Sequence, residues 1–302
     1  MAIVEGTDLV KDYDGLRAVD HVSFAIDRTE CFGFLGPNGA GKTTVMKMIY
    51  CRTPVTHGDV RVGGISVRME PRQVKDMIGV ATQDDTLDRD LTVFENLMVY
   101  SRYFDTPRAV ARQRIGDLLA RFDLTGKRDT NVDDLSGGMR RKLIVARALI
   151  NDPSILILDE PTTGLDPQAR RQIWDMVIRL KTEGKTIILT THYMDEAQEL
   201  CDRIAVMFSG RILECGTPED MISRVVGAHV CEIYARDETA VREIRKNISG
   251  NMEQVGNRLY VYGDNPEELA MKCDHVRSEY RVVRRTSLED VFLKLTGGKE
   301  IK

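Results

Sequence analysis

A glycine-rich segment near the N-terminus has the residue types needed to hold a phosphate. Its spacing is one glycine, four residues, then Gly-Lys-Thr. The segment, called the P-loop below, is Gly36, Pro37, Asn38, Gly39, Ala40, Gly41, Lys42, Thr43 and Thr44. Glycines let the backbone wrap closely around a phosphate and present N–H groups to its oxygens, and a helix that follows adds its positive end. We expect Lys42 to reach the β- and γ-phosphates of a nucleotide, and the Thr43 hydroxyl to bind Mg²⁺.

Two adjacent carboxylates supply the groups that hydrolysis of such a nucleotide needs. Asp159 and Glu160 directly follow the aliphatic run Ile155-Leu-Ile-Leu158, which is typical of a strand buried on both faces. The end of that strand places Asp159 beside the P-loop, where it can hold Mg²⁺ through water. Glu160 then lies near the γ-phosphate and can polarise an attacking water. Taken alone, the pair has a simpler interpretation as the polar end of a strand at a turn.

A second segment also looks like an anion-binding site. Ser136, Gly137 and Gly138 open an apolar-periodic helix predicted over 139–150. The serine hydroxyl and the first N–H groups of that helix form an anion site at its positive end. One chain therefore has two candidate phosphate-binding segments almost a hundred residues apart.

The elements that must position these residues are strands that alternate with helices, which predicts a parallel sheet with crossover helices. Residues 84–150 are mostly helical. The strands are predicted over 3–10, 18–26, 31–35, 60–67, 78–82, 155–158, 186–190, 204–208 and 211–215. The helices are predicted over 45–50, 92–102, 107–122, 139–150, 167–183 and 193–201.

The pattern changes after about residue 226, which divides the chain into domains 1–226 and 227–302. The second part is expected to contain strands at 229–235, 252–255, 259–262 and 280–283, with helices at 239–247, 266–273 and 287–295. The order βαββαβ with a terminal helix fits a small ferredoxin-like α+β domain.

Composition narrows the classes of function. The chain has 302 residues, 42% hydrophobic and 30% charged, with net charge −4 and pI near 5.8, which argues against nucleic acid as a partner. Six scattered cysteines without a CxxC pair indicate reduced thiols rather than disulfides or a zinc site. Because we find no signal peptide and no apolar run long enough to cross a bilayer, we expect a cytoplasmic protein that serves any membrane process through a partner.

Over residues 3–225 the sequence resembles the ATPase subunits of ATP-binding-cassette (ABC) transporters. The stretch Asp134-Leu-Ser-Gly-Gly-Met-Arg-Arg-Lys142, called the signature segment below, resembles the motif that distinguishes this family. The resemblance implies an α/β P-loop NTPase cassette with an antiparallel β subdomain and a helical subdomain at about 84–150. It also assigns roles to four single residues: Gln83 contacts Mg²⁺ and the attacking water, Asp166 belongs to the D-loop, His192 senses the γ-phosphate, and Tyr13 stacks on adenine.

Each of three lone residues also has an ordinary interpretation. His192 alone is a histidine at a strand end, Gln83 alone is a polar surface residue, and Tyr13 alone is half-buried packing. The order and spacing of all the motifs favour the functional interpretation. Little sequence context fixes Tyr13.

The resemblance also implies how such a chain works. In the family two copies face each other head to tail, and each ATP is bound by the P-loop of one copy and the signature segment of the other. With one P-loop and one signature segment, this chain is expected to form a homodimer, with ATP and Mg²⁺ bound. A cleft beside Gln83 receives the membrane subunit in the family. The candidates for it here are the loop 84–89 with Phe94, Leu97, Tyr100 and Tyr103.

Within the family the sequence most resembles the ABC-2 type, which includes ATPases of daunorubicin-type drug exporters and of nodulation lipo-oligosaccharide exporters. Three segments carry this resemblance: Leu158-Asp-Glu-Pro-Thr-Thr-Gly-Leu-Asp-Pro, Ala146-Arg-Ala-Leu-Ile-Asn-Asp-Pro and the tail Ser287-Leu-Glu-Asp-Val-Phe-Leu-Lys-Leu-Thr-Gly. We therefore expect export of a drug-like, lipid or glycolipid solute through a separate ABC-2 permease, from the cytoplasmic face of the membrane. A non-transport ABC ATPase and a regulatory ATP-binding module are the alternatives.

Overall fold

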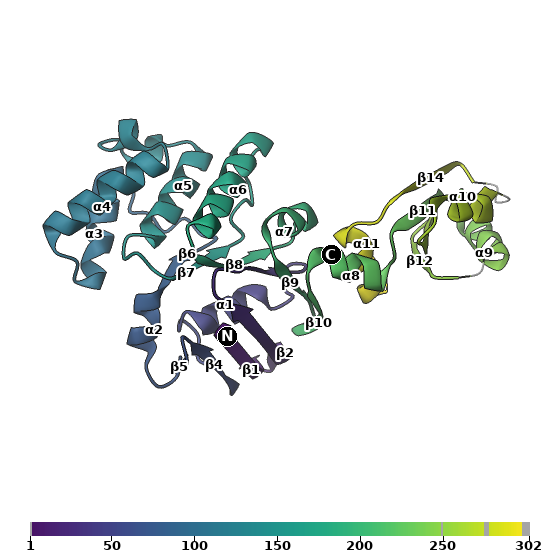
Figure 1. The fold of residues 1–302 in the computed structure, drawn as a ribbon, viewed down its shortest axis with the longest axis horizontal. Helices are drawn as coiled ribbons and strands as arrows, with labels where there is room; N and C mark the ends of the chain where they lie inside the picture. The colour runs from purple at the N-terminus through teal and green to yellow at the C-terminus, as the bar shows by residue number, and fades with distance from the viewer. Residues whose placement is uncertain (1, 249, 275–277, 298–302) are drawn as a thin grey trace. The chain divides into compact units, whose positions relative to one another are not determined.

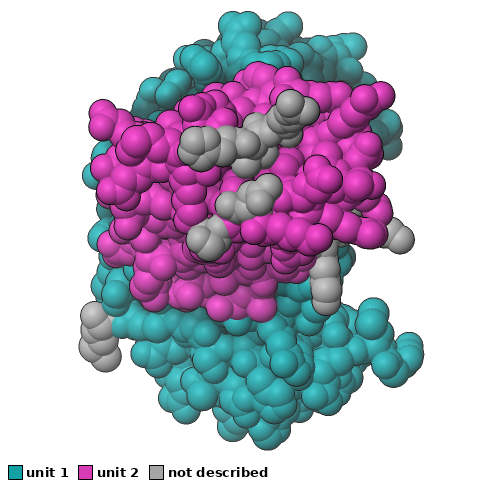
Figure 2. Space-filling view, turned by 90° about the vertical axis from the view of Figure 1, so that its right-hand side faces the viewer, with its two compact units in different colours: residues 1–212 teal, residues 213–302 magenta. Residues whose placement is uncertain are grey.

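The computed structural model describes residues 2–248, 250–274 and 278–297 and divides into two compact units. The first unit is residues 1–212 and the second is 213–302, as coloured in Figure 2. This division falls before the predicted boundary at 226, because helix α8 (Pro218–Val225) belongs to the second unit, where it packs against α11 (Leu288–Thr296). The predicted C-terminal domain runs to residue 302, and its last five residues lie outside the described part.

The main sheet has the strand order β10-β9-β3-β8-β7-β6 (Figure 1), and all of its strands except β10, which crosses the boundary at residue 212, belong entirely to the first unit. Its strands are β3 (Cys31–Leu35), β6 (Ile78–Ala81), β7 (Ile155–Asp159), β8 (Thr186–Thr191), β9 (Arg203–Phe208) and β10 (Arg211–Gly216). Strands β9, β3, β8, β7 and β6 are parallel neighbours. In register, Leu35 pairs with Thr191 and Asp159 with Thr190, so the carboxyl ends of three strands meet at one edge. This confirms the predicted α/β core.

A second sheet in this unit is antiparallel, with the order β2-β1-β4-β5. Its strands are β1 (Ala2–Tyr13), β2 (Leu16–Asp27), β4 (His57–Val62) and β5 (Ile65–Ser66). The single strand predicted over 60–67 is wrong, because Gly63 and Gly64 both have positive φ (59° and 82°) and turn the chain between β4 and β5. Helix α2 (Pro71–Met77), which begins with a proline at its first turn, was not predicted.

Helices accompany the parallel sheet and form a separate cluster. The helices that follow its strands are α1 (Lys42–Ile49), α6 (Pro167–Thr182) and α7 (Met194–Leu200). The cluster of α3 (Val93–Ser101), α4 (Arg108–Arg121) and α5 (Gly137–Ala148) lies at the upper left of Figure 1, with the short helices η1 (Arg102–Phe104), η2 (Thr125–Lys127) and η3 (Val132–Asp134) between them in sequence. Thr92 and Glu95 form a capping box that starts α3. The cluster matches the helical region predicted over 84–150.

The second unit contains a four-stranded antiparallel sheet with the order β12-β13-β11-β14. Its elements are β11 (His229–Tyr234), α9 (Glu238–Asn247), β12 (Met252–Val255), β13 (Arg258–Gly263), α10 (Pro266–Asp274) and β14 (Tyr280–Arg285). This order and connectivity confirm the ferredoxin-like prediction. Helix α11 is attached to the sheet by two parallel hydrogen bonds from Arg284 to the buried Asp290, of 2.8 and 2.9 Å.

Among the described residues, we find no helix that is both long enough and apolar enough to cross a membrane.

Candidate active site

The P-loop connects β3 to α1, and two of its glycines are required by close contacts. A Cβ atom on Gly36 would lie 2.2 Å from the carbonyl oxygen of Met207, and one on Gly41 would lie 2.5 Å from that of Ala18. Gly41 also has a φ of 101°, in the region that favours glycine. Of the remaining predicted residues, Pro37 and Ala40 are buried, Asn38 and Gly39 form the exposed tip, and Thr43 and Thr44 lie in the first turn of α1.

Lys42 is buried at the base of this loop. Its Nζ donates to the carbonyl oxygens of Gly36 (2.8 Å) and Pro37 (3.0 Å) and lies 3.6 Å from Oε1 of Glu160. Burial lowers the pKa of Lys42, and the charges of Glu160 and Asp159 oppose that effect. The amino group of Lys42 is therefore held between two backbone carbonyl oxygens of the P-loop and the carboxylate of Glu160.

Asp159 ends β7 and accepts hydrogen bonds from two threonines. Thr43 Oγ1 donates to its Oδ1 at 3.1 Å and Thr190 Oγ1 donates to the same oxygen at 2.5 Å. The structure thus brings together two of the three predicted metal ligands, Thr43 from the P-loop and Asp159 from β7, while the third, Gln83, contacts Glu160. The described residues contain no group of three or more His, Cys, Asp or Glu that could hold a metal ion. A carboxylate with a neighbouring hydroxyl is instead the sparse set of oxygens typical of Mg²⁺, which takes its other ligands from phosphates and water.

Glu160 is the centre of the site, and its side chain is contacted by four other residues. Its Oε2 accepts from Gln83 Nε2 (3.3 Å) and Thr163 Oγ1 (3.0 Å), and it lies 3.4 Å from Nδ1 of His192. Its Oε1 faces Lys42. The residue is 7% exposed and has a φ of 46°, which is unusual for a residue other than glycine. Three of the predicted catalytic residues therefore surround the carboxylate of the fourth, Glu160. They are Lys42, Gln83 and His192.

The signature segment begins α5, as predicted, although the helix starts two residues earlier. Ser136 is the N-cap, and its Oγ accepts from the backbone N–H of Met139 at 3.3 Å. Gly137 lines an open hollow of about 360 Å³ together with Gln83 and Glu160. Within the part of the chain that the structure describes, no hydrogen bond or ion pair joins Ser136, Gly137 or Gly138 to the P-loop.

Asp166 lies at the start of α6, where its carboxylate accepts from the backbone N–H groups of Gln168 and Ala169, both at 2.9 Å. The side chain therefore caps a helix in this chain. A Cβ atom on Gly138 would lie 3.2 Å from that of Ala169, so the start of α5 packs closely on the first turn of α6. The role of Asp166 toward nucleotide stays a prediction.

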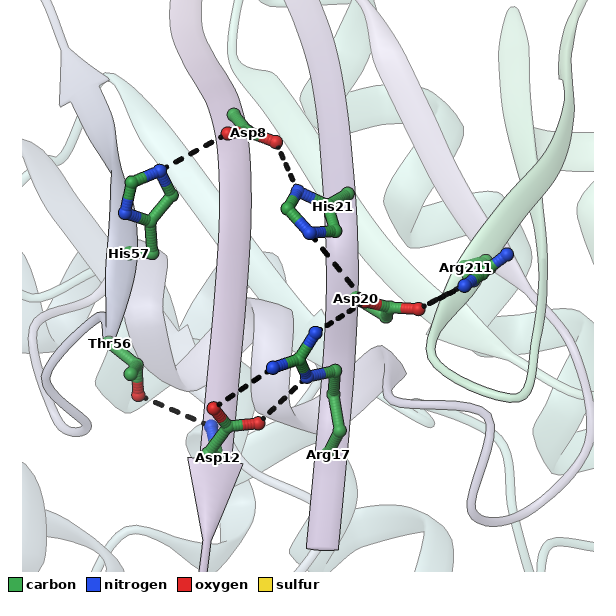
Figure 3. Close-up of polar contacts among 8 residues, drawn as sticks. All are labelled: Asp8, Asp12, Arg17, Asp20, His21, Thr56, His57 and Arg211. Atoms are coloured by element: carbon green, nitrogen blue, oxygen red, sulfur yellow. Dashed lines mark hydrogen bonds and ion pairs between the residues drawn. The ribbon is translucent and has the colours of Figure 1, made fainter.

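Tyr13 ends β1 and is 39% exposed, with Nζ of Lys11 4.7 Å from its ring centroid. Figure 3 shows a charged network on the two strands of this hairpin: Arg17 donates to Asp12 (3.0 Å) and Asp20 (3.1 Å), and Arg211 donates to Asp20 (2.6 Å). Farther along the same strands, Asp8 contacts His21 and His57. The network joins the two strands of the hairpin, and the partly exposed Tyr13 lies at its end. Its contact with adenine stays a prediction.

Two threonines in the site were missed by sequence reasoning. Thr190 contacts Asp159 and the backbone of Glu160, and Thr163 contacts the Glu160 carboxylate. Only the position of Thr190 in the sequence could have indicated its role, because it lies at the carboxyl end of a buried strand next to β7. A threonine is common in strands, so its type alone did not indicate this role.

A larger cavity of about 1030 Å³ lies between the helical cluster and the sheet. Its lining includes Thr86, Asp88, Tyr100 and Tyr103 from the predicted cleft, with Arg147 from α5. Leu97 does not belong to it, because its side chain is fully buried in the cluster. Phe94 packs under Arg128, whose guanidinium lies 4.3 Å from the ring centroid. We call this cavity the helical groove.

Comparison with known proteins shows the family of this chain. The family model described as "ABC transporter" matches residues 19–163, and the model described as "Nodulation factor export protein NodI, C-terminal domain" matches residues 236–297. The Nod factor export ATP-binding protein I of Rhizobium etli is 43% identical over 98% of this chain and 94% of its own length. The protein of the same name from Burkholderia pseudomallei is 43% identical over 98% of both chains.

Solved structures resemble most of the chain. CbiO1 from Clostridium perfringens, part of an ABC transporter complex, has a TM-score of 0.68 at 28% identity and covers 74% of this chain and 91% of its own. A dimeric ATP-binding cassette in a post-hydrolysis state, bound to ADP and Pi, has a TM-score of 0.65 at 26% identity and covers 71% and 98%.

Proposed function

The chain belongs to the ATP-binding subunits of ABC transporters, and from this premise we propose that it works as a homodimer that powers export of a lipid-linked oligosaccharide or related solute through a separate membrane permease. As a member of the family it is an ATPase coupled to transport. The observation that carries the proposal is the convergence of Lys42, Gln83, Thr163 and His192 on Glu160.

Hydrolysis depends on the side chains around Glu160. Its carboxylate orients and polarises the attacking water, and Gln83 and His192 both lie next to its Oε2. Lys42 supplies positive charge to the γ-phosphate, and the N–H groups of the P-loop bind its oxygens. Burial makes these interactions stronger than they would be in water.

Mg²⁺ fits the oxygens at the end of β7. Asp159 and the Thr43 hydroxyl, 3.1 Å apart, would hold it, with Gln83 as the further predicted ligand. When bound, the metal neutralises charge on the phosphates. Thr190, which donates to Asp159, keeps that carboxylate oriented toward Thr43.

The ATP sandwich is supported by the placement of the signature segment. Ser136, Gly137 and the first turn of α5 present an anion site, and among the described residues no hydrogen bond or ion pair joins it to the P-loop of the same chain. A second copy turned head to tail would bring its own signature segment to the first copy's phosphate. ATP then stabilises the closed dimer, since it makes contacts there that the open form lacks.

The permease is proposed to dock in the helical groove. The groove combines exposed aromatic rings with polar groups, and Tyr103 is 77% exposed on its rim. Docking there would place the protein on the cytoplasmic face of the membrane. The ABC-2 type of the permease rests on the branch resemblance, and the solute class rests on the relatives named for Nod factor export.

Glu160→Gln tests this proposal in the purified chain. The amide preserves the shape of the side chain but cannot act as a base, so we expect ATP to bind, turnover to fall by about 100-fold or more, and a dimer to accumulate with ATP in size-exclusion chromatography. Glu199→Gln, the same change on the exposed face of α7, is the matched control for the loss of one carboxylate.

A second variant tests where the dimer forms. Adding Ser136→Asp to Glu160→Gln places a negative charge in the signature segment, which should prevent the dimer while the P-loop still binds ATP. A Glu160→Gln chain that stays monomeric with saturating ATP contradicts the sandwich. A double variant that still forms the dimer contradicts the role of the signature segment.

A further inference from the structure

Arg141 is a buried arginine of α5 whose guanidinium group binds three backbone carbonyl groups. Its Nη1 donates to Thr82 O (2.6 Å), its Nη2 to Asp159 O (2.9 Å) and its Nε to Pro161 O (2.8 Å). The side chain is 7% exposed. A group with several donors in a rigid plane can hold three oxygens in one fixed arrangement, which a lysine ammonium cannot reproduce.

These carbonyl groups lie next to the two side chains that meet at the site. The carbonyl of Thr82 belongs to the peptide unit that leads into Gln83, and the carbonyl of Asp159 belongs to the unit that leads into Glu160. The carbonyl of Pro161 follows Glu160 by one residue. Because each peptide unit is planar, fixing its carbonyl also fixes the position of the next nitrogen. Arg141 therefore constrains the backbone of both Gln83 and Glu160.

The backbone of Glu160 needs such a constraint. Its φ of 46° lies in the left-handed region, where a residue with a side chain persists only if its surroundings determine the conformation. The N–H of Glu160 is held from the sheet by Thr190 O and Oγ1 (3.2 and 3.0 Å). Arg141 holds the carbonyl groups of the residues before and after it. The strained residue is thus fixed from β8 on one side and from α5 on the other.

Arg141 also lies on the helix that begins with the signature segment. Ser136 caps α5, and Arg141 follows it by little more than one turn. Burial lowers the pKa of Arg141 to about 10, with Asp159, Glu196 and Glu160 opposing that effect, so the guanidinium is charged at neutral pH. A displacement of α5 would therefore be transmitted to Gln83 and Glu160 through a charged group with three bonds.

We propose that Arg141 is a positioning residue for ATP hydrolysis, which holds the backbone of Gln83 and Glu160 so that their side chains meet and ties both to the signature helix. The inference rests on the roles proposed above for Gln83 and Glu160. It goes beyond them because it assigns a function to a side chain that has no part in the mechanism proposed above.

The test compares Arg141→Met and Arg141→Lys in the full chain. Misplacement of a catalytic group by about 1 Å costs about 100-fold in rate, so kcat of Arg141→Met should fall by about that factor. KM for ATP, the equilibrium affinity for ATP and the number of ATP sites per chain should stay near those of the wild type, because the P-loop is untouched. Arg141→Lys should recover only part of kcat, since an ammonium group reaches fewer of the three carbonyl groups.

Arg114→Met is the matched control. It removes a guanidinium that donates to Ile150 O (3.3 Å), just beyond the other end of α5 and away from Glu160. Its kcat should equal that of the wild type. An unchanged kcat in Arg141→Met would overturn the inference. A fall in kcat that only matches a fall in the number of ATP sites per chain would overturn it too, because such a fall means that part of the protein is unfolded. If Arg141→Met does not fold, a wild-type kcat in Arg141→Lys overturns it equally.

Glu160→Gln, measured in parallel, separates this inference from the proposed function. Full turnover in Glu160→Gln means that the proposed role of Glu160 fails. Loss of turnover in Glu160→Gln together with wild-type kcat in Arg141→Met means that only the role of Arg141 fails.

Discussion

Replacing Thr190 by valine removes one hydroxyl group from the buried end of β8 and nearly preserves the shape of the side chain. Thr190 is fully buried, and its Oγ1 donates to Asp159 Oδ1 at 2.5 Å while it accepts from the N–H of Glu160 at 3.0 Å. The variant removes both bonds. No carboxylate, P-loop residue or glycine is altered, so the change in the free energy of unfolding measures the contribution of the hydrogen bonds made by this hydroxyl, above all the bond to Asp159.

The expected cost is dominated by the bond to Asp159. A hydrogen bond to a charged group contributes about 1.5–3 kcal/mol, more than one between neutral groups. The N–H of Glu160 keeps the Thr190 carbonyl oxygen as a partner at 3.2 Å, so losing the hydroxyl there adds little. Asp159 keeps the bond from Thr43. We therefore expect a loss of about 2 kcal/mol in the free energy of unfolding of the first unit.

Thermal unfolding followed by calorimetry measures this loss. For a unit of this size, about 2 kcal/mol corresponds to a fall in Tm of about 4–8 °C. Thr182→Val is the control, because it removes an exposed threonine hydroxyl that donates to Arg179 O (2.8 Å) at the end of α6, and it should change stability by less than about 0.5 kcal/mol. Equal Tm values for the two variants would refute the reasoning, since the buried bond would then contribute no more than the exposed one.

Three further substitutions test packing, helix propensity and charge burial. Gly79→Ala should destabilise the first unit by about 3 kcal/mol in urea unfolding, because the new Cβ would lie 1.9 Å from a backbone oxygen at the end of α5; a loss below about 1 kcal/mol would contradict this. Gly116→Ala on the exposed face of α4 meets no atom within 4 Å and should stabilise the unit by about 0.5–1 kcal/mol, and a loss of stability would count against it. Burial raises the pKa of Glu196 above its ordinary value of 4.5, so its contribution to stability is complete below pH 4.5 and is lost as pH rises through the raised pKa. The Tm of Glu196→Gln minus that of the wild type should therefore increase with pH above 4.5. A difference that does not change with pH would refute the raised pKa of Glu196.

Local patterns made the glycine-containing parts of the candidate site predictable. The P-loop and the start of α5 are short segments in which glycine and hydroxyl residues have a direct backbone role, so their positions could be read from the sequence. The same holds for β7, where a continuous aliphatic run ends in Asp159. The ferredoxin-like order of the second unit also followed from local alternation of strands and helices.

Other features depend on tertiary contacts that no local pattern encodes. Leu97 and Tyr100 lie on the same predicted helix, yet only Tyr100 lines the helical groove, because the packing of α3 against its neighbours decides which face is covered. The break between β4 and β5 depends on two adjacent glycines that a strand pattern tolerates. In the sequence, Arg141 is one of several basic residues that follow the signature glycines. Only the fold shows that its side chain is buried and donates to backbone carbonyl groups.

The contacts of Glu160 combine a firmly held backbone with a loosely held side chain. Its Oε2 faces Gln83 (3.3 Å), Thr163 (3.0 Å) and His192 (3.4 Å), all at or beyond the usual length of a hydrogen bond. Among the described residues, the Nδ1 of His192 has no hydrogen-bond partner. One carboxylate oxygen has two lone pairs and cannot satisfy three donors well. Exchanging one of these donors for a water molecule therefore costs little, while the backbone stays fixed from both sides. A general base needs this combination, because it must keep its position while it changes its hydrogen-bond partner from the protein to the water that it activates.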